Sequence, residues 1–291
     1  METGIFYAVC AGLFWGSSPV LVKRGLAQSD VSAATLYQQA TILLTLIIAA
    51  LIEGDLWSQR MAVMPLAVFV VTGIVGAYLG RTLFVKSVAQ IGASRAQSLN
   101  NSSPLITVLL AALLLGEALS PAVLLGVLLI IAGVIFVTKS EPQSDIKTSH
   151  TLTITSVLAA LCYGIVPVLK KLGTDLGGPP VAGALVMHAT GLILLLTLGR
   201  LLKIELKWHK LPARSLVCFI AAGVCQGVGS ILTLKALVYA PASVVAPIWS
   251  AQPIISFFLT KSMLQGIEVV TFRDGAAAAL VVAGVLVLRW G

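Results

Sequence analysis

The feature that most constrains this chain is a series of long apolar stretches with short polar connections between them. The hydrocarbon core of a bilayer is about 30 Å thick, so a helix that rises about 1.5 Å per residue needs about 20 mostly apolar residues to cross it. The sequence therefore predicts an all-α membrane protein with ten transmembrane helices. The ten stretches are Gly4 to Val22, Ala33 to Ile52, Leu66 to Val88, Ala93 to Leu115, Pro121 to Thr138, Leu152 to Leu172, Pro179 to Leu201, Ser215 to Tyr239, Ser243 to Leu264 and Val269 to Leu288.

Composition and connection lengths exclude several classes of protein. Hydrophobic residues make up 58% of the chain and charged residues 10%, a balance that would expose large apolar patches if the solvent were water. The longest connections, Lys139 to His150 and Lys203 to Pro212, leave no room for a catalytic domain outside the membrane. The spans contain no His-Glu-x-x-His, no Gly-x-Ser-x-Gly and no paired Asp residues. We therefore predict that the protein is not an enzyme and uses no cofactor and no metal.

The net charge of +8 does not indicate a nucleic-acid partner. The basic residues are scattered at the predicted helix ends, Lys170 and Lys171 among them, and they form no run with interleaved aromatic residues. Contact with membrane lipid is the better interpretation of this charge. The first stretch is followed by Lys23 and Arg24 rather than by small residues, so we expect it to be retained and not cleaved as a signal peptide.

The chain contains an internal repeat. Residues 15–25 (WGSSPVLVKRG) and residues 163–173 (YGIVPVLKKLG) are identical at six of eleven positions. The similarity continues at a nearly constant offset through the later spans. Further equivalent pairs are Gly80 and Gly229, Lys86 and Lys235, Ala93-Ser94 and Ala242-Ser243, Pro104 and Pro253, Glu117 and Glu268, and Ala132-Gly133-Val134 and Ala283-Gly284-Val285.

Two five-helix units follow from this repeat: residues 1–138 and residues 151–291, joined by a linker at 139–150. Because five is an odd number, the second unit enters the membrane from the opposite face, and the repeat is predicted to be inverted. Inverted repeats enclose a central site that can open to either side of the membrane in turn. The predicted architecture therefore favours transport.

Polar side chains inside hydrocarbon cost free energy unless they are paired or hydrated, so those within the spans are candidates for a binding site. The fourth span carries a dense polar cluster at residues 97–103, and the equivalent part of the ninth span, residues 247–253, carries an aromatic residue, an amide and two prolines. We expect these segments to face each other across a cavity; alternatively, their polar side chains join helices. The residues predicted to bind a solute are Trp15, Tyr78, Arg81, Gln97, Asn100, Asn101, Tyr163, Trp249 and Gln252.

Prolines interrupt the spans at matched positions in the two units. Pro19 and Pro167 occupy equivalent places in the first and sixth spans, and Pro104 and Pro253 in the fourth and ninth. A proline inside a helix removes one backbone donor and frees a carbonyl. We predict that these four residues act as hinges beside the binding region, although prolines are also common in membrane helices that bind nothing.

Few ionisable side chains lie within the spans. Arg81 lies deep enough either to hold a carboxylate or phosphate of the solute or to be paired structurally. His188 could relay protons or pack between helices. No Asp or Glu occupies the central part of a span, and Glu117 and Glu268 stand at span ends, where they could cap the following helix or bridge to a nearby base.

Two motifs resemble one known family. The segment Pro104 to Ser120 (PLITVLLAALLLGEALS), followed by Gly126 and Gly133, is similar to the fourth and fifth helices of the EamA family of the drug/metabolite transporter superfamily. Trp15-Gly16-Ser17-Ser18 resembles the first helix of that family. The resemblance covers the whole chain as two EamA-like units and implies a central cavity built by helices from both.

These observations favour a secondary transporter of a small polar or zwitterionic metabolite, an amino acid being one candidate, that works as an exporter or facilitator by alternating access. The partners expected are a small-molecule substrate and membrane lipid, and the location is a cell membrane, such as a bacterial inner membrane. The sequence gives no indication of oligomeric state. The resemblance also permits a lipid-carrier flippase or a noncatalytic membrane assembly subunit.

Overall fold

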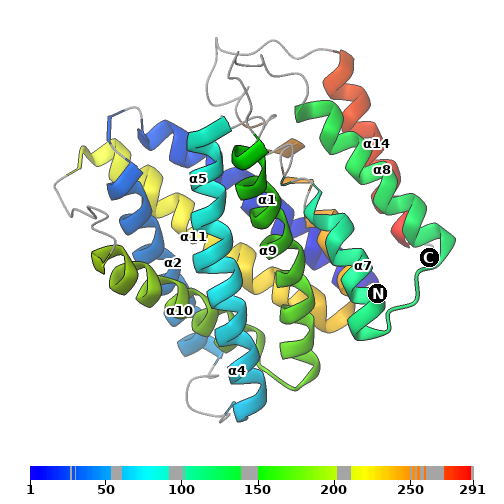
Figure 1. Cartoon of the computed structure of the whole chain (residues 1–291), viewed down its shortest axis with the longest axis horizontal. Helices are drawn as coiled ribbons and strands as arrows, with labels where there is room; N and C mark the ends of the chain where they lie inside the picture. Colours follow the sequence, from blue (N-terminus) through cyan, green and yellow to red (C-terminus); the bar gives the residue numbers. More distant parts are fainter. Residues whose placement is uncertain are drawn as a thin grey trace.

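The computed structural model describes residues 1–26, 28–29, 31–53, 61–91, 100, 102–138, 150–201, 211–249, 251–252, 254–255, 259 and 272–289. This part of the chain consists of helices and short connections, with no strand (Figure 1). The principal helices are α1 (Glu2–Leu26), α2 (Val31–Glu53), α4 (Val63–Thr72), η1 (Gly73–Gly80), α5 (Arg81–Ile91), α7 (Ser103–Leu115), α8 (Pro121–Thr138), α9 (His150–Asp175), α10 (Pro180–Leu201), α11 (Ala213–Tyr239), α12 (Ala242–Trp249) and α14 (Phe272–Arg289).

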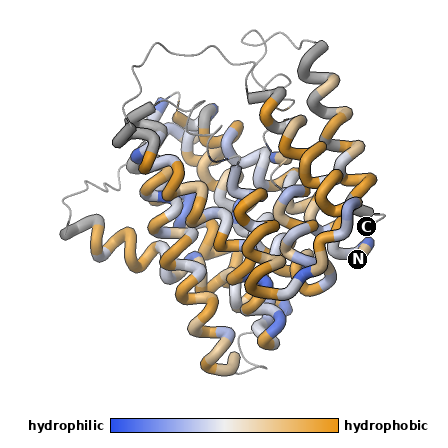
Figure 2. The backbone as a smooth tube through the Cα atoms, turned by 45° about the vertical axis from the view of Figure 1, so that its right-hand side comes forward, coloured by the Kyte–Doolittle hydropathy of each residue, from blue (hydrophilic) through white to orange (hydrophobic). Residues whose placement is uncertain are grey.

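Six stretches of helix in the described residues are long and apolar enough to cross a membrane. They are Glu2–Leu26, Ala34–Glu53, Val63–Phe84, Ile154–Asp175, Pro180–Leu198 and Ala213–Tyr239. Two shorter apolar stretches, Ser103–Leu115 and Pro121–Gly133, add to them. Figure 2 shows hydrophobic residues along most of these helices. Large apolar side chains are exposed on them, with Leu113 78% and Ile52 80% exposed, as expected for surfaces that face lipid.

The helix from Val63 to Ile91, made of α4, η1 and α5, contains a π-helical segment. At its end the Arg81 N–H reaches the Gly76 carbonyl, five residues back. Gly80 follows Phe69 by eleven residues, whereas the equivalent Gly229 follows Phe219 by ten, and α11 is α-helical throughout. A π-turn is the way a helix absorbs one extra residue. The residues before and after the π-helical segment therefore keep positions equivalent to those in α11, despite the extra residue between them.

Helix α1 runs antiparallel to α11. Gly4 lies against Ala240, Gly229 lies against the Trp15 ring, and Gly25 lies against Phe219. Two hydrogen bonds join the same pair of helices: Ser18 Oγ donates to the Ala222 carbonyl at 3.1 Å, and Ser215 Oγ donates to the Gly25 carbonyl at 2.8 Å.

Helix α9 makes the matching set of contacts with the helix from Val63 to Ile91, also in antiparallel sense. Gly173 lies against Phe69, Gly80 against Tyr163, and Ser87 hydrogen-bonds to Ser156. Gly173 and Tyr163 are the repeat equivalents of Gly25 and Trp15, so the contacts that these two residues make with α11 have counterparts here. The first helix of each half thus packs on the third helix of the other half.

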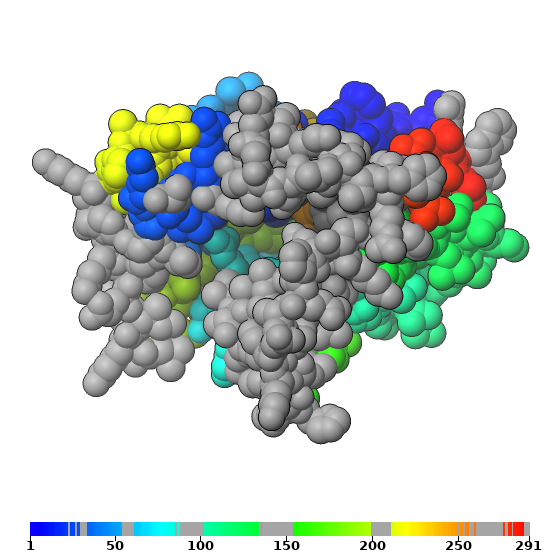
Figure 3. Space-filling view, turned by 90° about the horizontal axis from the view of Figure 1, so that it is seen from above, coloured from blue at the N-terminus to red at the C-terminus, as the bar shows by residue number. Residues whose placement is uncertain are grey.

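Helices α8 and α14 lie side by side at one edge of the molecule, and α2 and the first part of α11 lie toward the opposite edge (Figures 1 and 3). Gly284 in α14 packs on Gly126 and Ile130 in α8. Figure 1 shows the start of α8 beside the end of α14, so these two equivalent helices run in opposite directions.

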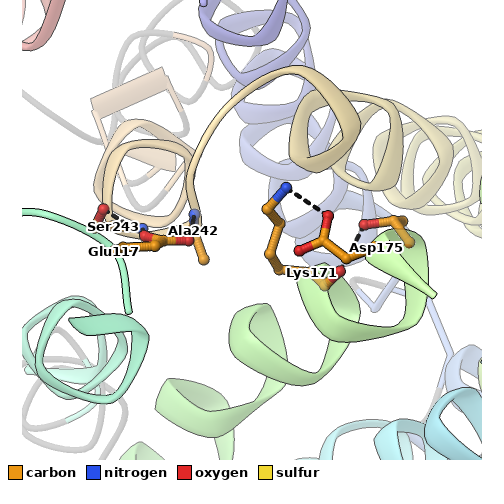
Figure 4. A network of polar contacts seen from close by, with 6 residues as sticks. Glu117, Lys171, Asp175, Ala242 and Ser243 are labelled. Atoms are coloured by element: carbon orange, nitrogen blue, oxygen red, sulfur yellow. Dashed lines mark hydrogen bonds and ion pairs between the residues drawn. The ribbon is translucent and has the colours of Figure 1, made fainter. Parts of the chain in front are cut away.

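Glu117 holds one half of the chain to the other (Figure 4). Helix α7 ends at Gly116, whose φ of 67° reverses the chain in the left-handed conformation that glycine adopts readily. The Glu117 carboxylate then accepts hydrogen bonds from the N–H groups of Ala242 at 2.8 Å and Ser243 at 2.9 Å, and from Ser243 Oγ at 2.6 Å. Glu117 therefore caps α12, not the following helix α8, whose Val123 N–H instead donates to Ser120 Oγ at 3.2 Å.

Gly16 permits the closest approach between α1 and the segment after α12. A Cβ placed on Gly16 would lie 2.7 Å from the Gln252 carbonyl oxygen, whereas a Cβ on Gly12, one turn earlier, would meet nothing closer than 3.7 Å. We expect Gly16→Ala to lower stability by about 1–3 kcal/mol, because backbone must move to relieve the overlap. The thermal unfolding midpoint of the purified protein measures this loss. Gly12→Ala is the matched control, and equal midpoints for the two variants would contradict the prediction.

Candidate substrate-binding cavity

A cavity of about 430 Å³ lies between the two halves of the chain. Helices of both halves contribute to its wall: α1, α2, α4, η1, α5, α7 and α8 from the first, and α9, α10, α11 and α12 from the second. The wall combines aromatic, amide and basic side chains. The lining residues that carry the site are Trp15, Gln39, Arg81, Phe84, Asn100, Ser103, Tyr163, Lys170, His188, Gln226, Ser230, Trp249 and Gln252.

Most of the described residues that the sequence assigned to solute binding line this cavity. They are Trp15, Arg81, Asn100, Tyr163, Trp249 and Gln252. Tyr78 is not in the cavity wall, although Ala77 and Arg81 of the same helix are. Gln97 and Asn101 lie outside the described residues.

The four predicted hinge prolines have different surroundings. Pro19 lines the cavity from within α1, and Pro167 is buried within α9. Pro104 also lines the cavity, but it lies in the first turn of α7. At that position its missing N–H costs no helical hydrogen bond. Pro253 lies outside the described residues.

Aromatic side chains form the walls of the cavity. The Trp15 and Trp249 rings meet edge to face with centroids 5.9 Å apart, and Trp15 Nε1 donates to Thr233 Oγ1 at 3.3 Å. On the other side, the rings of Phe84 and Tyr163 meet edge to face at 6.2 Å. Such pairs are more stable than face-to-face stacks because ring edges are positive and ring faces negative. Both halves thus place a helix-one aromatic residue against the third helix of the other half.

Arg81 begins α5 and is held by a chain of hydrogen bonds. Its Nη2 donates to Gln38 Oε1 at 3.3 Å, and Gln38 Nε2 donates to Ser18 Oγ at 3.1 Å. Ser18 Oγ then donates to the Ala222 carbonyl. Gln38 and Ser18 are both buried. This chain orients the guanidinium from one edge, and its other donors have no hydrogen-bond partner among the described residues.

Lys170 corrects the sequence interpretation, which placed it at a helix end on the membrane surface. The side chain is only 5% exposed and lines the cavity, with Nζ 5.1 Å from the centre of the Trp249 ring. Its neighbour Lys171 does face outward, where it pairs with Asp175 at 2.7 Å (Figure 4). The difference arises because Lys170 lies seven residues after Tyr163, two helical turns along the same face of α9.

His188 also lines the cavity, where its Nε2 lies 2.8 Å from Ser230 Oγ. Its Nδ1 has no partner among the described residues, and neither do Asn100 Oδ1 and Trp249 Nε1, although all three atoms are buried. Buried polar atoms normally have hydrogen-bond partners. Three such atoms around one cavity mark the places where a bound solute or water would complete the network.

Gln39, Gln226, Ser230 and Lys170 were not predicted, although the repeat contains a signal for two of them, Gln39 and Ser230. An offset of 149 pairs Gln39 with His188 and Arg81 with Ser230. The same offset pairs Ala77 with Gln226, and both line the cavity. Transferring His188 and Arg81 to their repeat equivalents would therefore have found Gln39 and Ser230, whereas Gln226 is equivalent to an alanine that the sequence did not single out. Lys170 has no such signal, because its equivalent is Val22.

Comparison with known proteins identifies the family. The profile of the EamA-like transporter family matches residues 2–139 and again residues 151–290. A solved structure described only as the crystal structure of a protein is similar over 99% of this chain and 96% of its own, with a TM-score of 0.79 and 17% identity, which shows a common fold. A search of curated proteins found no match. Since the profile covers nearly the entire chain in two copies, this protein belongs to the EamA-like transporter family.

Proposed function

We propose that the chain is a secondary transporter with ten membrane spans in two inverted five-helix repeats, residues 1–138 and 151–291, in a cell membrane. It moves a small polar or zwitterionic metabolite by alternating access. The observation that carries this proposal is the cavity itself, whose wall is built from repeat-equivalent positions of both halves: Asn100 and Trp249, Ser103 and Gln252. The opposite directions of α8 and α14 support the inversion.

The packing between the halves supports alternating access. Helix α1 packs on α11, and α9 packs on the helix from Val63 to Ile91. Similar helix contacts, made by different side chains, therefore occur on both sides of the cavity. Two similar but unequal halves can exchange conformations and open a shared site to opposite faces of the membrane. Trp15 and Tyr163, which occupy equivalent positions, are placed to change the accessibility of the site when the halves exchange.

The cavity favours a water-soluble solute over a lipid carrier. Its volume of about 430 Å³ is that of a metabolite-sized pocket, and amide, imidazole, guanidinium and ammonium groups all contribute to its wall. A lipid tail would bury these groups without hydrogen bonds, which is costly. We therefore place the solute among small polar molecules.

A solute screen tests the proposed function. A true ligand raises the thermal unfolding midpoint of the purified protein because it binds the folded state, and its uptake can then be measured in proteoliposomes. Asn100→Leu is expected to weaken binding about 10-fold by removing one hydrogen bond. Tyr78→Phe is the control, since Tyr78 lies outside the cavity wall. Equal affinities of the Asn100 variant and the wild type would remove Asn100 from the site.

A further inference from the structure

We propose that the cavity selects a small organic anion and that Arg81 and Lys170 are the residues that bind its charge. This inference rests on the transport function proposed above and narrows the solute class from polar or zwitterionic to net negative. It follows from the charges in the cavity wall, from the position of Lys170 over the Trp249 ring and from the polar atoms around the cavity that have no partner among the described residues.

The charge of the cavity wall is positive. Arg81 comes from the first half and Lys170 from the second, and no Asp or Glu is found among the described residues that line the cavity. The ion pairs in the described ranges join other residues, Lys171 with Asp175 and Lys235 with Glu53. A buried charge without a counterion is costly. A negatively charged solute between the halves would supply that counterion to both side chains.

A zwitterion fits this wall poorly. Its ammonium group would meet two cationic side chains and no carboxylate among the described lining residues. Aromatic rings can also bind ammonium groups, but Lys170 Nζ already occupies the Trp249 ring at 5.1 Å, and the Trp15 ring packs edge to face on Trp249. The positive end of a zwitterion would therefore reduce affinity, whereas an anion without an ammonium group avoids that cost.

The buried polar atoms of the wall that have no partner among the described residues indicate which other groups the solute carries. Trp249 Nε1 can only donate a hydrogen bond, so it calls for an oxygen acceptor on the solute. The Asn100 amide and the His188 Nδ1 provide two more polar positions in the same wall. Together they fit a short carbon chain that carries a carboxylate or phosphate and further oxygen atoms, such as a hydroxy acid or a phosphorylated acid.

The test compares solutes of similar size and different charge with the purified full-length chain. The probes are malate and 3-phosphoglycerate as anions, glutamine as zwitterion, lysine as cation and glucose as neutral solute. We expect at least one anion to raise the unfolding midpoint and to be taken up by proteoliposomes, with an affinity at least 10-fold above that of every other class. Malate carries carboxylates alone, whereas 3-phosphoglycerate carries one carboxylate and one phosphate, so tighter binding of 3-phosphoglycerate than of malate would indicate recognition of the phosphate.

Single substitutions then assign the binding groups. Arg81→Gln and Lys170→Met are each expected to weaken anion binding about 10- to 100-fold, since each removes a charge-assisted hydrogen bond. Lys171→Met is the matched control, because Lys171 is the adjacent lysine of α9 but pairs with Asp175 outside the cavity. Lys170→Arg retains the charge and should recover part of the affinity. Unfolding midpoints without solute show whether each variant is folded.

The outcomes separate this inference from the proposed function. Binding and uptake of glutamine or lysine in preference to the anions would overturn the anion assignment while leaving the transport function intact. Wild-type anion affinity in both folded variants, Arg81→Gln and Lys170→Met, would also overturn it. Absence of binding and uptake for every charge class would contradict the transport function and this inference together.

Discussion

Replacing Lys170 by glutamate is expected to abolish anion uptake and to shift the preference of the cavity toward cations. Lys170 Nζ lies over the Trp249 ring inside the cavity and is 5% exposed. At an effective dielectric constant of about 20, unit charges about 6 Å apart interact by roughly 3 kcal/mol. Reversing the sign of one charge turns this attraction into repulsion, so anion affinity should fall by at least about 100-fold. Uptake of labelled malate and lysine by proteoliposomes measures both changes.

The control for this variant is Lys171→Glu, which makes the same change of charge one residue along α9. Lys171 is paired with Asp175 away from the cavity, so its reversal should alter stability more than solute preference. Malate uptake at the wild-type rate in Lys170→Glu, with its unfolding midpoint preserved, would show that Lys170 does not face the transported solute.

Replacing Glu117 by glutamine or alanine is expected to cause the largest loss of stability among single substitutions in the connecting segments. The carboxylate accepts three hydrogen bonds at the start of α12, from two backbone N–H groups and one hydroxyl. Hydrogen bonds to charged groups contribute about 1.5–3 kcal/mol each, and loss of a helix cap costs about 0.5–2 kcal/mol. Because such contributions are not additive, we expect a total loss of about 2–4 kcal/mol. Glutamine cannot replace the carboxylate, since its NH₂ group would face a donor.

Thermal unfolding of Glu117→Gln and Glu117→Ala measures this loss, and Glu53→Gln provides the control. Glu53 also makes a short ion pair, with Lys235 at 2.6 Å, but its side chain is 36% exposed. Exposed ion pairs contribute little to stability, about 0–1 kcal/mol. A loss in Glu117→Gln no larger than in Glu53→Gln would contradict the role of Glu117 in holding α12. Since α12 carries Trp249, the Glu117 variants should also weaken solute binding.

Much of the fold could be predicted because lipid imposes a simple rule on sequence. A helix in hydrocarbon must be mostly apolar, so spans such as Pro180–Leu198 are visible without any knowledge of their neighbours. The repeat was visible for a similar reason, because equivalent helices in the two halves must fit equivalent partners. Gly16 and Gly164 illustrate this. A Cβ on Gly16 would crowd Gln252 and Ile255, and a Cβ on Gly164 would crowd the equivalent residues Ser103 and Ile106.

The cavity was only partly predictable. Trp15 and Tyr163 were found because they are large aromatic residues at equivalent positions of the two units. Trp249 was found because it lies in a polar segment of an otherwise apolar span. Lys170 was missed because a lysine near a span end can extend its long side chain to the membrane surface. Its actual direction depends on the rotation of α9 about its axis, which contacts with other helices decide.

Sequence alone determined that the chain is helical, apolar enough for lipid and made of two related units, because each of these properties depends on residues close together in the chain or on one offset between the halves. Tertiary structure decided that Glu117 caps a helix of the other half, that a π-turn absorbs one extra residue before Arg81, and that Arg81 and Lys170 face the same cavity. These contacts join residues far apart in sequence, and their geometry follows from how helix faces pack, which no local pattern of residues records.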